Sequence, residues 1–304
     1  MNVLVSFADS RMLKSSKRLL NQAKKFNFFD KIFLLNENDL SKNFKNKFKK
    51  ELILGSKGYG YWCWKPEIIL NILDKLNNDD CLLYIDIGCH LNINGKNRLL
   101  EYFEIVKQQD KGILAFQACK PNKKNSKIDY DGRKLMNSKN YQWIKGDVFD
   151  FFEARYDTNL TNSEGIGGGI FLIKKSEKSI KIIKKWREII LNNFNFINDT
   201  PSISPNLEGF IENRHDQAIW TLLCLKEKIK IVSAYEYWYP KKNSTRLEPD
   251  WQALEKFPIH AKRDKDLGFY GNSKLIFKKK LYKLFNALSK IGIGKKPVKK
   301  NFYS

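Results

Sequence analysis

Short apolar runs along the chain predict buried strands at six places. Unbroken runs of about four to eight apolar residues, bounded by polar or turn-forming residues, are typical of strands that are covered on both faces. Two of the runs begin with glycine, and all are rich in Val, Ile, Leu or Phe. The six segments are residues 3–8, 31–35, 81–86, 112–116, 168–173 and 229–232.

Helical spacing of apolar residues separates most of these runs. Pro66 suits the first position of a helix, since it has no N–H to leave unpaired there, and Ser176 suits an N-cap. Strands that alternate with helices predict an α/β domain at residues 1–272 with a mostly parallel central sheet. The predicted helices lie near residues 13–23, after Pro66, at 99–106, at 176–192 and at 216–225.

Two polar stretches without periodicity interrupt the alternation, at residues 120–139 and 193–206. The first is predicted to be a loop or lid, and the second a loop. In open α/β sheets, ligands bind beyond the carboxyl ends of the strands. Asp9, Asp86 and the loop after Phe116 follow predicted strands, so we expect a binding site where they meet.

Length and composition exclude several classes of protein. The chain has 304 residues, of which 42% are hydrophobic, and this excludes wholesale disorder. No apolar run approaches the roughly 18–20 residues of a membrane-spanning helix, and the N-terminal run lacks the basic lead of a signal peptide. The five cysteines form no CxxC pair, which predicts reduced thiols in a cytoplasmic protein.

The chain is strongly basic, with 56 Lys and Arg against 33 Asp and Glu and a net charge of +23. Residues 273–304 contain ten lysines and no acidic residue. In this segment Phe277, Leu281, Leu284 and Leu288 recur at helical spacing, opposite a lysine-bearing face. The pattern predicts a C-terminal basic amphipathic helix that binds an anionic membrane surface. A helix packed on the domain with its lysines in solvent is the alternative.

Two glycine-bearing motifs lie at the ends of predicted strands. Residues 84–88 read Tyr-Ile-Asp-Ile-Gly, so Asp86 ends a buried strand just ahead of a glycine. Residues 165–173 place three successive glycines before an apolar run, which lets backbone approach a ligand closely. No Gly-Lys-Ser/Thr follows, so this is not a phosphate-binding P-loop. A capping aspartate and a tight turn are the plain structural alternatives.

A polar cluster opens the helix predicted at residues 216–225. Arg214, His215, Asp216 and Gln217 stand together there, and polar groups that become buried must be paired. The helix N-terminus favours an ionised Asp216, which suits a general base or a group that orients a sugar hydroxyl. Capping by Asp216, with Arg214 and His215 on the surface, is the alternative.

Two further motifs carry candidate ligand contacts. Residues 58–66 hold four aromatic side chains among glycines, which suits either a platform for a sugar or base, or a core. Lys65 stands near the start of the following helix, where a phosphate would bind. The second motif holds His260 beside Lys262 and Arg263, a metal-ligand type next to two phosphate-binding cations.

Taken in order, these motifs resemble those of the nucleotide-sugar glycosyltransferases of the GT-A fold. Residues 60–66, 84–88 and 214–217 look most like a bacterial group that makes capsule or lipopolysaccharide O-chains. The resemblance covers roughly residues 1–265. It implies a GT-A (Rossmann-like) domain that transfers a sugar from a nucleotide-sugar donor, by default UDP-linked, to a glycan or lipid-linked acceptor.

The resemblance also implies a role for each matching residue. Asp216 would be the catalytic base if the enzyme inverts, or would orient the donor sugar if it retains. Both carboxylate roles require a position next to the transferred sugar. The implied donor-binding residues are Phe7, Asp9, Arg11, Trp64, Lys65, Asp86, Gly88, Gly168, Gly169, His215, Gln217, Lys262 and Arg263.

A divalent cation, Mn²⁺ or Mg²⁺, is a further implication of the resemblance, with Asp86 and His260 as its protein ligands. The chain departs from the related DxD motif at Gly88, where a carboxylate is missing. The need for a metal is therefore open, and Lys65, Lys262 or Arg263 would supply positive charge without one.

Together, the resemblance and the basic C-terminal segment imply a cytoplasmic enzyme at the inner face of the cell membrane. Two other functions stay open. The net charge of +23 alone suits nucleic-acid binding equally well, although no helix-turn-helix, zinc-finger or RNA-recognition signature is present. The missing carboxylate suits a sugar-binding relative without catalysis.

Overall fold

The computed structural model describes residues 1–243 and 248–264. The predicted basic helix within residues 273–304 lies outside the described residues. Among those that are described, no helix is both long and apolar enough to cross a membrane.

A central sheet of six strands has the order β2-β1-β3-β6-β5-β7. β6 runs antiparallel to both of its neighbours, and the other pairings are parallel. The strand bounds are β1 Asn2–Phe7, β2 Lys31–Leu35, β3 Cys81–Ile85, β5 Ile113–Gln117, β6 Ile166–Lys174 and β7 Lys230–Ser233. This confirms the predicted α/β fold with a mostly parallel sheet, and all six strands lie where the apolar runs placed them.

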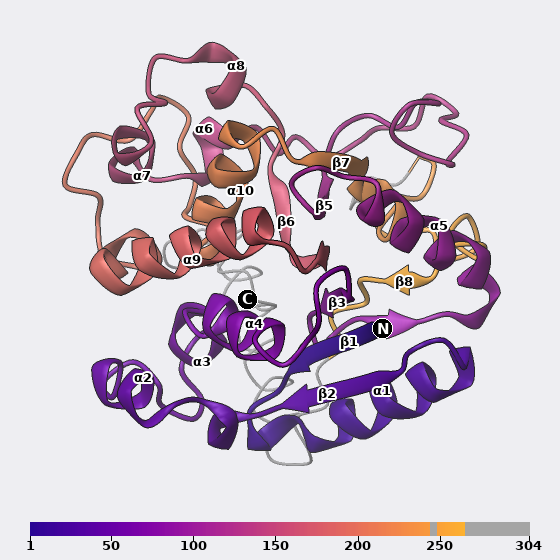
Figure 1. Cartoon of the computed structure of the whole chain (residues 1–304). Coiled ribbons are helices and arrows are strands. Elements are labelled where there is room, and N and C mark those ends of the chain that lie inside the picture. The colour runs from indigo at the N-terminus through magenta and orange to yellow at the C-terminus, as the bar shows by residue number, and fades with distance from the viewer. Residues whose placement is uncertain (244–247, 265–304) are drawn as a thin grey trace, which may run out of the picture.

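Helices cover both faces of the sheet (Figure 1). In residues 1–243 and 248–264, five long helices follow the predicted segments, and five short ones were not predicted. The long ones are α1 Leu13–Phe26, α4 Lys65–Leu73, α5 Lys96–Lys107, α9 Glu177–Asn192 and α10 Asp216–Lys226. The short ones are α2 Lys42–Lys47, α3 Gly58–Tyr61, α6 Asn140–Trp143, α7 Gly146–Phe151 and α8 Thr158–Thr161.

Alternation along the strands divides the core into two layers. In β3, Leu82 and Tyr84 belong to the layer under α4, α9 and α10, whereas Leu83 and Ile85 belong to the layer under α1 and α5. Successive side chains of a strand point to opposite faces, so an unbroken apolar run fills both layers at once. The sheet is therefore packed on both faces.

A second, two-stranded sheet was not predicted. It pairs β4 His90–Leu91 with β8 Ile259–His260 and sets His90 opposite His260. Strands of two residues carry too little pattern to be seen in a sequence.

The polar stretch at residues 120–139 contains no helix or strand, as expected, but its hydrogen bonds describe an anchored loop. The hydroxyl of Ser126 and the N–H of Lys127 both donate to the buried carboxylate of Glu236. Arg98 donates two more bonds of 2.8 Å to the same carboxylate. A buried carboxylate with several donors is costly to uncover, so this part of the loop does not behave as a free lid.

Candidate active site

The candidate site lies at the carboxyl edge of the sheet, where β3 ends and β6 begins. Asp86 follows β3, and its N–H donates to the carbonyl of Gly169, with 2.8 Å between the nitrogen and the oxygen. Because β6 runs antiparallel, its glycines lie at this edge, inside the strand rather than in a turn. A side chain at Gly169 would have no room, since a Cβ there would lie 2.6 Å from Oδ2 of Asp86.

Lys65 connects the two predicted carboxylates. Its Nζ lies 2.7 Å from Oδ2 of Asp216, 2.8 Å from the carbonyl oxygen of Gly168 and 3.6 Å from Oδ1 of Asp86. The side chains of Lys65 and Asp216 are 2% and 5% exposed, and that of Asp86 is 40% exposed. Lys65 thus donates hydrogen bonds to Asp216 and Gly168 and forms an ion pair with Asp86, whereas the sequence suggested a donor phosphate as its partner.

Burial and charge act in opposite directions on this pair. Burial raises the pKa of Asp216 to about 6, although Lys65 works to lower it. Burial works to lower the pKa of Lys65, but the carboxylates of Asp216 and Asp86 outweigh it, so that this pKa is raised. Near neutral pH both groups are therefore charged, and the carboxylate of Asp216 accepts a proton within the range in which enzymes use bases.

Tyr84 completes this cluster and was not predicted as a site residue. Its hydroxyl donates to Oδ1 of Asp86 at 2.8 Å, and Nζ of Lys65 lies 5.4 Å from the centre of its ring. The signal was present in the sequence, because residues two apart in a strand share one face. Tyr84 and Asp86 have that spacing.

The segment labelled α3 is a left-handed turn, and it precedes Lys65 in the chain. All five residues from Gly58 to Trp62 have positive φ, at 57°, 50°, 84°, 55° and 61°. This conformation costs non-glycine residues roughly 1–2 kcal/mol each, and Tyr59, Tyr61 and Trp62 all adopt it. Such strain persists only where the surroundings fix it, and it is common at functional sites.

Phe7 and Trp64 lie in the core beside this turn. Their rings stack with centres 3.9 Å apart, and the two residues are 3% and 4% exposed. The indole N–H of Trp64 donates to the carbonyl of Gly58. Of the four aromatic side chains at residues 58–66, for which a platform or a core was predicted, Tyr59 and Trp64 are buried, whereas Tyr61 and Trp62 are partly exposed.

His215 and Gln217 flank Asp216 as the sequence suggested. His215 has a φ of 56° and is 6% exposed, and burial lowers the pKa of its ring. Gln217 lies against the glycine strand, where a Cβ on Gly168 would be 3.3 Å from the Cβ of Gln217 and from Oδ2 of Asp216.

Asp9 and Arg11 lie beyond the end of β1 and bind each other. Nε and Nη2 of Arg11 donate to the two carboxylate oxygens of Asp9 at 2.9 and 2.6 Å. Asp9 is buried, whereas the side chain of Arg11 is 37% exposed. A guanidinium fixed in this way suits recognition of a phosphate, because Arg forms planar bidentate contacts.

The last described residues pack against the turn that carries Asp86. The N–H of Asp264 donates to the carbonyl of Gly88, and a Cβ on Gly88 would lie 3.2 Å from Cα of Arg263. Glycine at the third position of the DxD-like motif therefore lets this segment approach. Lys262 lies with its Nζ 5.6 Å from the centre of the Trp251 ring.

The described residues do not form a complete metal centre. In residues 1–243 and 248–264, no three His, Cys, Asp or Glu side chains gather in a metal-binding arrangement. Nε2 of His260 lies 2.9 Å from the carbonyl oxygen of Leu254, so only Nδ1 is left for a metal. Among the described residues, Lys65 forms an ion pair with Asp86, with Nζ 3.6 Å from Oδ1.

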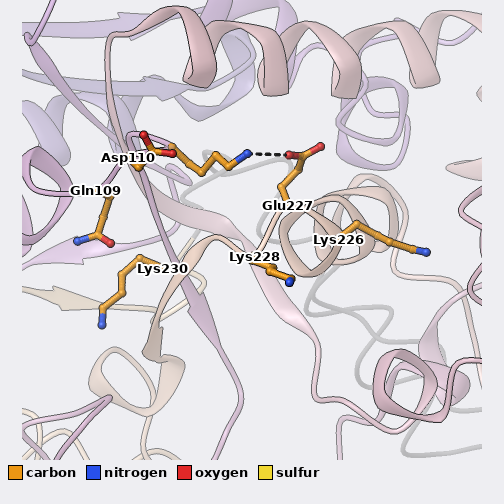
Figure 2. A pocket seen from close by; sticks show the side chains of 7 residues that line it. Gln109, Asp110, Lys226, Glu227, Lys228 and Lys230 are labelled. Atoms are coloured by element: carbon orange, nitrogen blue, oxygen red, sulfur yellow. Dashed lines mark hydrogen bonds and ion pairs between the residues drawn. The ribbon is translucent and has the colours of Figure 1, made fainter.

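A cavity of about 330 Å³ lies at the opposite edge of the sheet, before β5 and β7 begin. It is lined by Gln109, Asp110, Lys111, Lys226, Glu227, Lys228 and Lys230 (Figure 2). Lys111 pairs with Glu227 at 3.4 Å, and the ammonium groups of Lys226 and Lys230 point in different directions. The cavity therefore brings together no set of groups comparable to that around Asp216.

Substituting Gly169 by alanine is expected to destabilise the site. The new Cβ would displace the carboxylate of Asp86, which is 2.6 Å away, and overpacking of this kind costs about 1–3 kcal/mol. Urea unfolding measures the loss. Gly165→Ala is the matched control, because its nearest neighbour would be 3.6 Å from the new Cβ. Equal unfolding free energies for the two variants would contradict the packing described.

Comparisons with known proteins do not assign a family. No family model and no curated protein matches the sequence. Among solved structures, a glycosyltransferase involved in the glycosylation of the major capsid of PBCV-1 has a TM-score of 0.43 and 9% identity, covering 85% of this chain and 91% of that one. Mouse xyloside xylosyltransferase 1 has a TM-score of 0.41 and 11% identity, covering 86% and 96%.

The galactosyltransferase LgtC, in complex with donor and acceptor sugar analogs, has a TM-score of 0.35 and 13% identity, covering 86% of each chain. These structural neighbours are glycosyltransferases. At such low TM-scores and identities the likeness itself does not define the reaction of this chain.

Proposed function

We propose that this chain is a GT-A-type glycosyltransferase, which moves a sugar from a nucleotide-sugar donor, by default UDP-linked, to a hydroxyl of a glycan or lipid-linked acceptor. The observation that carries the proposal is the buried Lys65–Asp216 pair beside the more exposed Asp86, at the carboxyl edge of an α/β sheet. That edge is where such sheets bind ligands. Glycine backbone in β6 borders the same pair, and the lack of side chains there lets Asp86 and Asp216 pack closely against the strand.

The reaction exchanges one bond to the anomeric carbon for another. The bond from this carbon to the diphosphate oxygen breaks, the bond to the acceptor oxygen forms, and the acceptor hydroxyl loses its proton. We assign acceptance of that proton to Asp216, which gives inversion. Its pKa of about 6 suits a base near neutral pH. In a retaining reaction Asp216 would instead orient the donor sugar.

The remaining residues fit binding of the donor. Asp86, with its half-exposed carboxylate, accepts hydrogen bonds from ribose or sugar hydroxyls. Arg11, Lys262 and Arg263 bring positive charge for the diphosphate, which is the leaving group and gains negative charge as the bond breaks. Lys65 is a positioning residue, because its buried ammonium group pairs with the carboxylate of Asp216 and favours the ionised form of that carboxylate.

A thermal-shift screen tests donor binding directly. A ligand that binds only the folded protein stabilises it, by about 2.7 kcal/mol at a hundredfold excess over Kd. We expect the largest rise in Tm with a UDP-linked sugar, measured with and without Mn²⁺. The matching free sugars are the control. Equal Tm values with and without every nucleotide sugar would argue against the proposal.

The acceptor is proposed to lie at an anionic membrane, as in the assembly of bacterial capsule or lipopolysaccharide. The support is sequence alone, from the ten lysines of residues 273–304. Deleting residues 273–304 is expected to reduce sedimentation with vesicles containing phosphatidylglycerol, and not with vesicles of phosphatidylcholine. Unchanged binding after the deletion would disprove this membrane contact.

A further inference from the structure

A second cluster of side chains lies beside the Lys65–Asp216 pair. The rings of Tyr61 and Trp62 have their centres 5.3 and 5.5 Å from that of His215. The hydroxyl of Tyr61 donates to Oδ2 of Asp199 at 3.3 Å, and Nζ of Lys57 lies 3.1 Å from Oδ1. The Asp199 side chain is nevertheless 56% exposed, so a carboxylate held from two sides still faces solvent.

Two hydrogen-bond acceptors face each other in this cluster. Nδ1 of His215 is 2.6 Å from the carbonyl oxygen of Ile197. A carbonyl only accepts, so Nδ1 carries the proton and Nε2 of the neutral ring keeps a lone pair. Nε2 lies 3.9 Å from Oδ1 of Asp199, and a carboxylate only accepts as well. A ligand that brings hydroxyl donors satisfies both atoms.

Tyr61, Trp62 and His215 lie on the same two chain segments as the proposed catalytic pair, whereas Asp199 lies on a third, the loop at residues 193–206. The carbonyl of Trp62 accepts from the N–H of Lys65, and His215 directly precedes Asp216. The strained turn at residues 58–62 therefore fixes Tyr61 and Trp62 at a constant distance from Lys65. A ring bound at the aromatic side chains would therefore lie against the same two chain segments that carry Lys65 and Asp216.

We propose that Tyr61, Trp62, His215 and Asp199 form the subsite for a sugar ring of the acceptor glycan, an inference that rests on the proposed function. The two partly exposed aromatic rings cover an apolar face of the sugar. Asp199 and Nε2 of His215 accept hydrogen bonds from its hydroxyls, and Lys57 fixes the carboxylate. The ligand class is thus a hydroxyl-bearing glycan without a carboxylate on the bound ring, because a second carboxylate would meet Asp199.

An array of immobilised bacterial surface oligosaccharides, probed with the full chain, tests the subsite without catalysis. We expect wild type and Asp216→Asn to bind the same glycans. Asp199→Asn is expected to lower affinity by roughly tenfold or more, since hydrogen bonds to charged groups are the strong ones. Asp110→Asn is the matched control, because Asp110 is exposed and lies at the opposite edge of the sheet.

The thermal shift produced by nucleotide sugars separates this inference from the proposed function. Asp199→Asn is expected to keep that shift while it loses glycan binding. Glycan binding that depends on Asp199 without any nucleotide-sugar shift would support the subsite and overturn the proposed transfer. The subsite is overturned if Asp199→Asn binds glycans like wild type, if it loses glycans and nucleotide sugars together, or if wild type binds no glycan on the array.

Discussion

Replacing Asp216 by asparagine is expected to lower turnover by about 10²- to 10⁴-fold, the range that general-base catalysis supplies. Asparagine has the size of aspartate but cannot take the acceptor proton. Lys65 keeps the carbonyl of Gly168 at 2.8 Å and Asp86 at 3.6 Å, so the variant retains partners for its buried ammonium. Release of nucleoside diphosphate from the nucleotide sugar measures the loss.

The folding of the Asp216→Asn variant is measured together with its turnover. Asp110→Asn is the control, because Asp110 is an exposed carboxylate paired with Lys178. Near-native circular dichroism with a lost rate is the expected result for Asp216→Asn. Full turnover in a folded Asp216→Asn protein would remove this residue from the reaction.

Replacing Lys65 by methionine is expected to change both stability and the pH dependence of activity. Methionine keeps an unbranched side chain but leaves the carboxylate of Asp216 buried without its cation. Loss of one partner of a buried pair costs about 3–5 kcal/mol. Lys65 lowers the pKa of Asp216 in the wild type, so its removal is expected to raise that pKa further.

The direction of each pH effect follows from this rise. Wild-type activity is expected to fall below about pH 6, where Asp216 gains a proton, and the fall in Lys65→Met should begin at higher pH. A carboxyl whose pKa is higher in the folded than in the unfolded state binds its proton more tightly when folded. The variant should therefore regain stability as the pH falls.

Urea unfolding at pH 5.5 and pH 8, together with a pH–rate profile, measures both effects. Lys185→Met is the control, since the side chain of Lys185 is 51% exposed. An acidic limb at the same pH in wild type and Lys65→Met would show that Lys65 does not govern the proton on Asp216.

The apolar pattern predicted the strands and long helices well, because burial on both faces produces runs that can be read locally. The direction of β6 could not be predicted in this way, since an apolar run does not reveal whether its strand pairs parallel or antiparallel with its neighbours. That direction matters, because it brings the glycines to the same edge as Asp86. The two-residue strands β4 and β8 were missed for lack of length.

The sequence identified residues of the candidate site better than it identified the contacts between them. Asp86, Asp216 and Lys65 were all chosen from the sequence, but Lys65 was expected at a phosphate. Its observed partners lie 103 and 151 positions away, and no local pattern indicates which distant charges meet. The left-handed turn could not be predicted either. Gly58 and Gly60 favour positive φ, but Tyr59, Tyr61 and Trp62 do not.

The Lys65–Asp216 pair also has a consequence for how this chain can evolve. Two apolar side chains of matching volume would often fold as well as a buried ion pair, or better, whereas losing one charge alone is strongly destabilising. Selection for folding alone would therefore tolerate loss of both charges and resist loss of either. Lys65 and Asp216 are therefore expected to be kept together or lost together in proteins that descend from this chain. If both charges were replaced by apolar residues, the fold would survive while the proposed catalysis would be lost.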